Sequence, residues 1–265
     1  EFDGGAILNS GGSLVVSQST LSGNTVSEDG FGAGISNAGA GTVSIIESTL
    51  TGNAGSYYGG AVDNEGTVTI ARSTLSDNGA LIGGAVANVG TLYIRNSTLS
   101  GNVATEAGGG IDNFLGTASV EFSTLTENAA GSGGGIENAA SISIKHSLVV
   151  NSAAGNNCVN NGGTFAALGV NFATDASCAG FTQTTAGEIN LGPLADNGGA
   201  TRTHALLSGS VAVDAALGCT LTDGTTPDQE QRGQARPVGA ECDSGAFEGS
   251  GSLPETIFLD GFENK

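Results

Sequence analysis

The sequence is poor in basic residues and in large aromatic ones. It has 7 Lys and Arg against 26 Asp and Glu, which gives a net charge of −19. This balance argues against a nucleic-acid partner, because a phosphate-binding surface needs clustered Lys and Arg side chains. There is no Trp and only 5% of the residues are Phe or Tyr, so the aromatic platforms that grip sugars are scarce.

Long apolar runs are also missing. No run approaches the roughly 18 residues of a membrane helix, so the sequence predicts no transmembrane segment. The chain opens on Glu1 inside a repeat, without Met, and we interpret it as a mature or truncated fragment. Helices are disfavoured, because the 46 glycines and the many β-branched residues are spread so that every stretch of helix length contains several of them.

What the sequence does have is a unit that recurs about every 25 residues up to about position 151. Each unit contains two asparagine-ended motifs, Gly-(Gly/Ala)-(Ala/Gly)-(Ile/Val)-x-Asn and Ser-Thr-Leu-(Ser/Thr)-x-Asn. The first ends at Asn9, Asn37, Asn64, Asn88, Asn113 and Asn138, and the second at Asn24, Asn53, Asn78, Asn102 and Asn128. We expect these asparagines to form two structural ladders of side-chain amides, one rung per unit.

Short runs with alternating polarity separate the motifs and indicate three strands per unit. In one unit Val62, Val68, Ile70 and Leu75 are expected to face inward, and Asp63, Thr67, Thr69 and Thr74 outward. The sequence therefore predicts an all-β fold, a right-handed parallel β-helix with three short strands per coil of about 25 residues. This register places Glu47 beside Arg72, and Arg95, Glu121 and Lys145 in one column of alternating charge.

All four cysteines follow the repeats, and their even number without a CxxC spacing fits two disulfides formed in an oxidising compartment. Pairing of neighbours gives Cys158–Cys178 and Cys219–Cys242. We divide the chain into regular coils (1–151), two to four irregular coils with a disulfide-pinned C-terminal cap that shields the last strand edge (152–248), and a tail (249–265).

The repeats resemble those of the chlamydial polymorphic outer-membrane proteins, although Leu replaces the Phe usual in their second motif. The later segment carries Leu191-Gly-Pro-Leu-Ala-Asp-Asn-Gly-Gly199, Thr203-His204-Ala205-Leu206 and Cys242-Asp243-Ser-Gly-Ala-Phe-Glu248. This series resembles the bacterial "choice-of-anchor Q" proteins, which are exported β-helix proteins of unassigned activity. The resemblance implies a secreted or cell-surface bacterial protein, and the tail from Ile257 to Glu263 resembles those of exported proteins.

Four charged residues of the cap segment, Arg232, Arg236, Asp243 and Glu248, are candidates for a buried ionic network that holds the cap. The alternative is that they form a site. The resemblance favours the structural interpretation, because it implies a fold without a known reaction.

The chemistry-bearing feature of the coils is a column of outward acids just before one asparagine ladder. It contains Asp63, Ala87, Asp112 and Glu137, with no base among them. Asp63, Asp112 and Glu137 are candidate ligand-binding residues, and Asp112 and Glu137 are candidate ligands of Ca²⁺, although no cofactor is required. The neighbouring column of Ala61, Ala85, Gly110 and Gly135 is expected to form a shallow outward floor beside the acids.

A second outward face carries hydroxyls. Its two columns are Ser13, Thr42, Thr67, Thr91, Thr117 and Ser141, and Val15, Ser44, Thr69, Tyr93, Ser119 and Ser143. Regular hydroxyl columns on a flat sheet are typical of ice-binding β-helices, and Tyr93 and the Ser substitutions interrupt this regularity.

Our leading hypothesis is an exported, non-enzymatic adhesin or surface-binding module that recognises a glycan or a cell-surface protein. The first alternative is a polysaccharide lyase or glycoside hydrolase, which needs acids and bases at defined separations. Signatures of pectate lyases and polygalacturonases are missing. An ice-binding or calcium-stabilised structural module is the further alternative.

Overall fold

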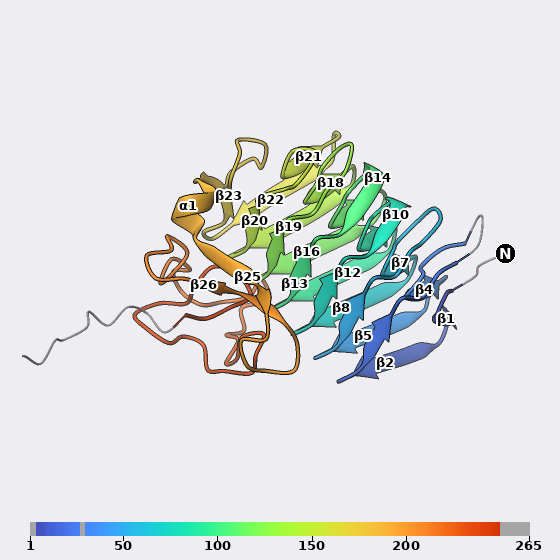
Figure 1. The fold of residues 1–265 in the computed structure, drawn as a ribbon, viewed down its shortest axis with the longest axis horizontal. Helices are drawn as coiled ribbons and strands as arrows, with labels where there is room; N and C mark the ends of the chain where they lie inside the picture. Colours follow the sequence, from blue (N-terminus) through green and yellow to red (C-terminus); the bar gives the residue numbers. More distant parts are fainter. Residues whose placement is uncertain (1–3, 27–29, 250–265) are drawn as a thin grey trace, which may run out of the picture.

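The computed structural model describes residues 4–26 and 30–249. Three parallel sheets run side by side along one axis, and each coil of the chain adds one strand to each of them (Figure 1). The predicted fold class, an all-β parallel β-helix, is therefore confirmed. Within the described part of the chain, no helix is long and apolar enough to cross a membrane.

The strands are grouped here by sheet, in the order in which they pair. Sheet A contains β1 (Ile7–Ser10), β4 (Ile35–Ala38), β7 (Val62–Asn64), β11 (Val86–Asn88), β15 (Ile111–Asn113), β18 (Ile136–Asn138) and β21 (Cys158–Asn160). Sheet B contains β2 (Ser13–Ser17), β5 (Thr42–Ile46), β8 (Thr67–Ala71), β12 (Thr91–Arg95), β16 (Thr117–Glu121), β19 (Ser141–Lys145) and β22 (Thr164–Leu168). Sheet C contains β3 (Thr20–Ser22), β6 (Thr49–Thr51), β9 (Thr74–Ser76), β13 (Thr98–Ser100), β17 (Thr124–Thr126), β20 (Leu148–Val150), β23 (Phe172–Ala173) and β24 (Thr182–Gln183).

The remaining elements are two strand pairs and one helical turn. They are β10 (Gly79–Ile82) with β14 (Val103–Ala107), the antiparallel pair β25 (Leu191–Ala195) and β26 (Thr203–Leu206), and α1 (Ala186–Ile189).

The inside of the β-helix is a stack of aliphatic columns. Val62 pairs with Ile35 and Val86, and Leu75 pairs with Leu50 and Leu99. Val62, Val68, Ile70 and Leu75 have no exposed surface, as the alternating pattern predicts. Burial of such side chains stabilises the fold by about 1.5–3 kcal/mol each.

The last turns differ from the prediction of two to four more coils. Strands β21 to β23 complete one further coil, and β24 begins another. The loop 174–181 then closes this end: the Cys158–Cys178 disulfide ties it to β21, and Cys178 and Phe181 pack on the core. Ser177 Oγ accepts a hydrogen bond of 2.9 Å from the backbone N–H of Cys158, which shields the edge of β21.

The segment from 191 to 249, which we call the lateral cover, lies along the outer face of sheet C, not across the end of the β-helix. Figure 1 shows it in orange and red beside the stacked strands. Thr74 Oγ1 donates to Arg202 O at 2.6 Å, and Thr98 Oγ1 donates to Gln231 Oε1 at 2.6 Å. Thr74 does face outward as predicted, but it is buried because the cover lies on it. The predicted tail lies outside the described residues, apart from Gly249.

Candidate functional site

The repeated asparagines form two continuous ladders. In each rung the Nδ2 of one asparagine donates to the Oδ1 of the next, for example Asn37 to Asn64 at 2.9 Å and Asn53 to Asn78 at 2.9 Å. The first ladder joins Asn9, Asn37, Asn64, Asn88, Asn113, Asn138 and Asn160, and the second joins Asn24, Asn53, Asn78, Asn102 and Asn128. These amides satisfy one another and backbone carbonyls, so their role is structural.

The structure contains a third ladder, which the sequence analysis did not predict. The serine that opens each Ser-Thr-Leu motif accepts a backbone N–H from the serine one coil before it, as in Ser48 N to Ser73 Oγ at 3.1 Å and Ser97 N to Ser123 Oγ at 3.2 Å. The signal was present, since this serine recurs in every unit at the same phase.

The predicted charge columns are present, with one difference in pairing. Arg72 and Glu47 form an ion pair at 2.8 Å, and Arg95 and Glu121 form one at 3.0 Å. Lys145 is in register with Glu121, but its Nζ donates instead to Leu221 O in the lateral cover, at 3.2 Å.

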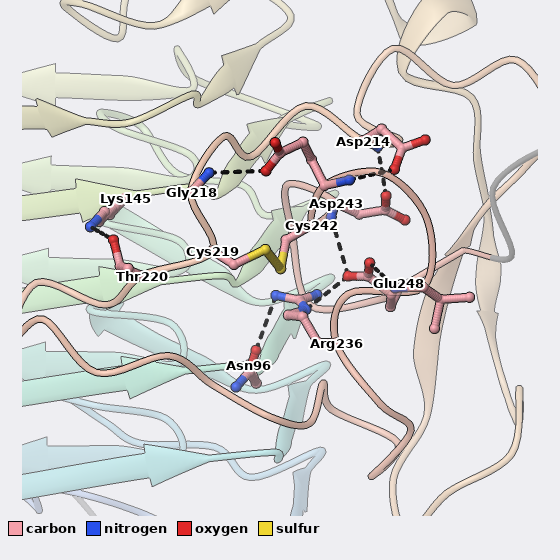
Figure 2. Close-up of a disulfide and its surroundings, with 12 residues drawn as sticks. Asn96, Lys145, Asp214, Gly218, Cys219, Thr220, Arg236, Cys242, Asp243 and Glu248 are labelled. Carbon is pink, nitrogen blue, oxygen red and sulfur yellow. Dashed lines mark hydrogen bonds and ion pairs between the residues drawn. A yellow bond between two sulfur atoms is a disulfide. The ribbon is translucent and has the colours of Figure 1, made fainter.

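The lateral cover holds a buried ionic network around the Cys219–Cys242 disulfide (Figure 2). Arg236 pairs with Glu248 at 2.9 Å, and both side chains are fully buried. The guanidinium also donates to Asn96 Oδ1 at 3.2 Å, which connects the cover to the β-helix. Asp243 contributes its backbone N–H to Glu248 Oε2, and its carboxylate accepts the backbone N–H of Asp214. Burial raises the pKa of the Asp243 carboxyl to about 6.

The fourth predicted member of this network, Arg232, pairs elsewhere. It binds Glu230 at 3.1 Å, a residue that the sequence analysis did not single out, and it donates to the backbone carbonyl of Glu248 at 2.7 Å. Its guanidinium also lies 3.6 Å from the centre of the Phe247 ring. A cavity of about 1010 Å³ adjoins Arg232 and Glu248, but the polar groups of both are already paired, which favours a structural role.

Neither histidine has the surroundings of a catalytic base. His146 is buried and stacks on Phe122 with ring centres 4.9 Å apart. His204 accepts from Ser100 Oγ and donates to Gly192 O, and burial lowers its pKa. This serine–histidine pair has no access to a substrate, because both residues are at most 2% exposed.

The part of the acidic column from Asp63 to Asp112 lies in a cleft of about 200 Å³ on sheet A. The register is the predicted one: Ala87 pairs with Asp63 on one side and with Asp112 on the other, and Asp112 pairs with Glu137. Asp63 and Asp112 line the cleft with Ala87 between them, so their Cα atoms are about 10 Å apart at roughly 4.8 Å per coil. The expected outward floor beside the acids is wrong, since Ala61 and Ala85 are fully buried in the core.

The walls of the cleft come from turns. They contain several of the few aromatic residues of the sequence. Tyr58 and Phe31 stack with ring centres 5.6 Å apart, and Phe114 lies among the lining residues. Phe114 and Leu115 are 54% and 69% exposed. Exposed apolar side chains gathered around a cleft are typical of a binding site.

The two carboxylates in the cleft are strongly desolvated. Burial raises the pKa of Asp63 to about 7, with a further contribution from the charge of Glu65. Burial likewise raises the pKa of Asp112 to about 7, helped by the charge of Glu137. Titrating groups of this kind in a cleft mark candidate functional sites.

Glu137 lies one coil beyond Asp112 and is not among the residues that line the cleft. Its Oε1 accepts from Asn161 Nδ2 at 2.5 Å. Within residues 4–26 and 30–249, no three His, Cys, Asp or Glu side chains are grouped so that they could hold a metal ion. Asp112 and Glu137 thus offer two carboxylates, at most four of the six to eight oxygen ligands that Ca²⁺ takes.

The two hydroxyl columns lie on the outer face of sheet B. Thr67 pairs with Thr42 and Thr91, and Thr69 pairs with Ser44 and Tyr93, in the predicted register. Tyr93 and Val15 are exposed and interrupt the second column.

Comparison with models of protein families, with curated proteins and with solved structures found no match for this chain.

Proposed function

We propose that the protein is an exported bacterial surface-binding module that holds a glycan in the cleft on the outer face of sheet A. One observation carries this proposal: aromatic walls and two desolvated carboxylates, Asp63 and Asp112, line the same cleft. An aromatic ring packs on the apolar face of a sugar, and carboxylates accept hydrogen bonds from its hydroxyls. The resemblance to choice-of-anchor Q proteins and the two disulfides support export.

The dimensions of the cleft favour a short segment of glycan. Its volume of about 200 Å³ is smaller than the roughly 300 Å³ at which pockets for drug-sized ligands begin. A single sugar ring is therefore the group expected to be enclosed, while the exposed Phe114 and Leu115 contact its neighbours along a chain.

An oligosaccharide panel tests this proposal. We expect measurable binding to at least one glycan, and about ten-fold weaker binding in Tyr58→Ala or Phe114→Ala, because each loses an aromatic contact. Tyr93→Ala is the matched control, since Tyr93 is an exposed aromatic on sheet B, away from the cleft. Absence of binding to every glycan, or equal losses in all three variants, would contradict the proposal.

A carbohydrate-active enzyme is the second candidate, favoured by the pKa of about 7 of both Asp63 and Asp112. A carboxyl that titrates near neutral pH can act as a general acid or base. Inverting hydrolases hold their two carboxyls about 6.5–9.5 Å apart, and the Cα atoms of Asp63 and Asp112 lie slightly farther apart, at about 10 Å. New reducing ends released by the wild type, and lost in Asp63→Asn and Asp112→Asn, would establish this activity. Binding without products supports the surface-binding module.

A further inference from the structure

The cleft on sheet A is acidic without a compensating base. Asp63, Glu65 and Asp112 line it, and none of its described lining residues is Lys, Arg or His. Glu106 on β14 and Glu137 on β18 add negative charge nearby, as their influence on Tyr58 and Asp112 shows. An anionic sugar such as a uronate would meet like charges in a partly desolvated site, which is unfavourable.

The second observation is that the two central carboxylates have no partner. Asp63 is 8% exposed and Asp112 is 5% exposed. Among the residues that the structure describes, neither carboxylate accepts a hydrogen bond or joins an ion pair, whereas Glu121, Glu230 and Glu248 all pair with arginine. A buried carboxylate without a partner is unfavourable, so the natural complement is a group that supplies a positive charge and N–H donors.

We propose that the group bound in the cleft is a protonated amine carried on a sugar ring, so that the ligand is a glycan with free amino groups. This inference rests on the proposed glycan-binding function. An ammonium gives charge-assisted hydrogen bonds to a carboxylate, and its charge is also attracted to the faces of aromatic rings such as those of Tyr58 and Phe31. The small side chain of Ala87 leaves room for a ring whose amine reaches one carboxylate and whose hydroxyl reaches the other.

Binding of a cation must couple to protons. Both carboxyls titrate at about pH 7, and a nearby positive charge favours the ionised form. Below pH 7 a ligand of constant positive charge therefore displaces protons as it binds, and its affinity rises as pH increases from 5.5 to 8. The other charged or titratable groups near the pair are Glu65 beside Asp63, Glu137 beside Asp112, and Tyr58, on which Tyr57 and Glu106 also act. None of these groups carries a positive charge.

Calorimetry with matched oligomers tests the inference on the full chain. The probes are a tetramer of β-1,4-linked glucosamine, the same tetramer with every amine acetylated, and methylammonium, which has N–H donors and keeps its charge between pH 5.5 and 8. We expect the free-amine tetramer to bind at least about ten-fold tighter than the acetylated one at pH 7. Methylammonium should bind more tightly at pH 8 than at pH 5.5.

Each outcome separates the two proposals. Equal binding of both tetramers overturns amine recognition and leaves the glycan-binding function standing. Binding of methylammonium without either tetramer supports amine recognition and contradicts the glycan function. Binding of none of the three overturns the inference, and displacement of the free-amine tetramer by millimolar Ca²⁺ but not Mg²⁺ assigns the carboxylates to calcium instead.

Two variants connect the result to the carboxylates. Asp63→Asn and Asp112→Asn keep the side-chain size and remove the charge, so each should weaken binding of the free-amine tetramer by about ten-fold and reduce the protons released. Proton release is measured as the difference in binding heat between two buffers of unlike ionisation enthalpy. Asp77→Asn, an exposed aspartate outside the cleft, makes the same change in net charge and should alter neither quantity. If Asp77→Asn weakened binding of the tetramer as much as the cleft variants do, the effect would come from the overall charge of the protein and not from the cleft.

Discussion

The outer faces of sheets A and C bury acids in opposite ways. Over sheet C, each of the two buried glutamates of the lateral cover pairs with an arginine of the cover itself, Glu248 with Arg236 and Glu230 with Arg232. On sheet A the carboxylates of Asp63 and Asp112 face a cleft with no described base in its lining. Both faces are built on the same coils, so the fold itself does not require unpaired acids.

This contrast separates groups that maintain structure from groups available to a ligand. A paired and hydrogen-bonded charge holds the cover in one position, whereas an unpaired buried charge reduces stability and is retained where it serves another purpose. The lateral cover also explains why its titratable residues, although numerous, are poor candidates for chemistry.

The largest effect is expected where a pair on the covered face is broken. Arg236→Met leaves Glu248 buried and unpaired, so the free energy of unfolding should fall by about 3–5 kcal/mol, as measured by urea denaturation. Arg202→Met, in which an exposed arginine of the same segment is replaced, is the control and should stay within about 0.5 kcal/mol. Similar values for the two variants would show that the network does not hold the cover.

A smaller loss is expected where the cover meets the β-helix through neutral groups. Gln231 accepts from Thr98 Oγ1 and donates to Thr74 Oγ1 and Ser73 O, all within 3.2 Å. Gln231→Ala leaves these buried groups unsatisfied and should lower the free energy of unfolding by about 1–3 kcal/mol. The exposed Gln234 provides the control: Gln234→Ala should be nearly neutral. An unchanged urea midpoint in Gln231→Ala would mean that the cover is held by its apolar contacts.

On sheet A a substitution of a buried acid should raise the free energy of unfolding instead of lowering it. The pKa of the Asp63 carboxyl rises from 3.8 to about 7 on folding, so the folded state holds more protons between these values and stability falls as pH rises from about 4 to 7. Asp63→Asn removes this loss and should raise the free energy of unfolding by on the order of 2 kcal/mol at pH 8. The gain should vanish at pH 3.5.

Denaturation of Asp63→Asn at several pH values measures this effect, with Asp77→Asn as the exposed counterpart. A variant that is less stable than wild type at pH 8 would show that the Asp63 carboxylate has a partner in solution. That result would also weaken the inference of an amine ligand, because the unpaired state of the carboxylate is one of its two supports.

The structural features that repeat once per coil were predicted from the sequence. The asparagine ladders, the inward Val62 and Leu75 columns and the pairing of Asp112 with Ala87 all follow from residues at a constant phase in the repeat. The acids of the candidate site were therefore found before the structure. Their depth of burial was not, because it depends on neighbouring turns.

The parts that were missed come from segments without periodicity. Phe31, Tyr58 and Phe114 belong to turns of unequal length, so no column places them beside the acids. The lateral cover lacks the repeat altogether, which is why the sequence analysis placed it at the end of the β-helix. Glu230 was not predicted for the same reason. Its ion pair with Arg232 depends on the path of the loop, and no repeat marks either residue.

The smallest expected effect compares a charge pair outside the cover with one beneath it. The side chains of Arg72 and Glu47 are 29% and 26% exposed, whereas in the pair of Arg95 and Glu121 the glutamate is 1% exposed. Arg72→Met should therefore lower the free energy of unfolding by less than about 1 kcal/mol, and 1 M NaCl should remove most of the difference from wild type. Arg95→Met should lose more and depend less on salt, because it leaves Glu121 buried without its arginine, although Thr222 still donates to the carboxylate. Equal losses and equal salt dependence in urea denaturation would show that the cover does not strengthen the charge pairs beneath it.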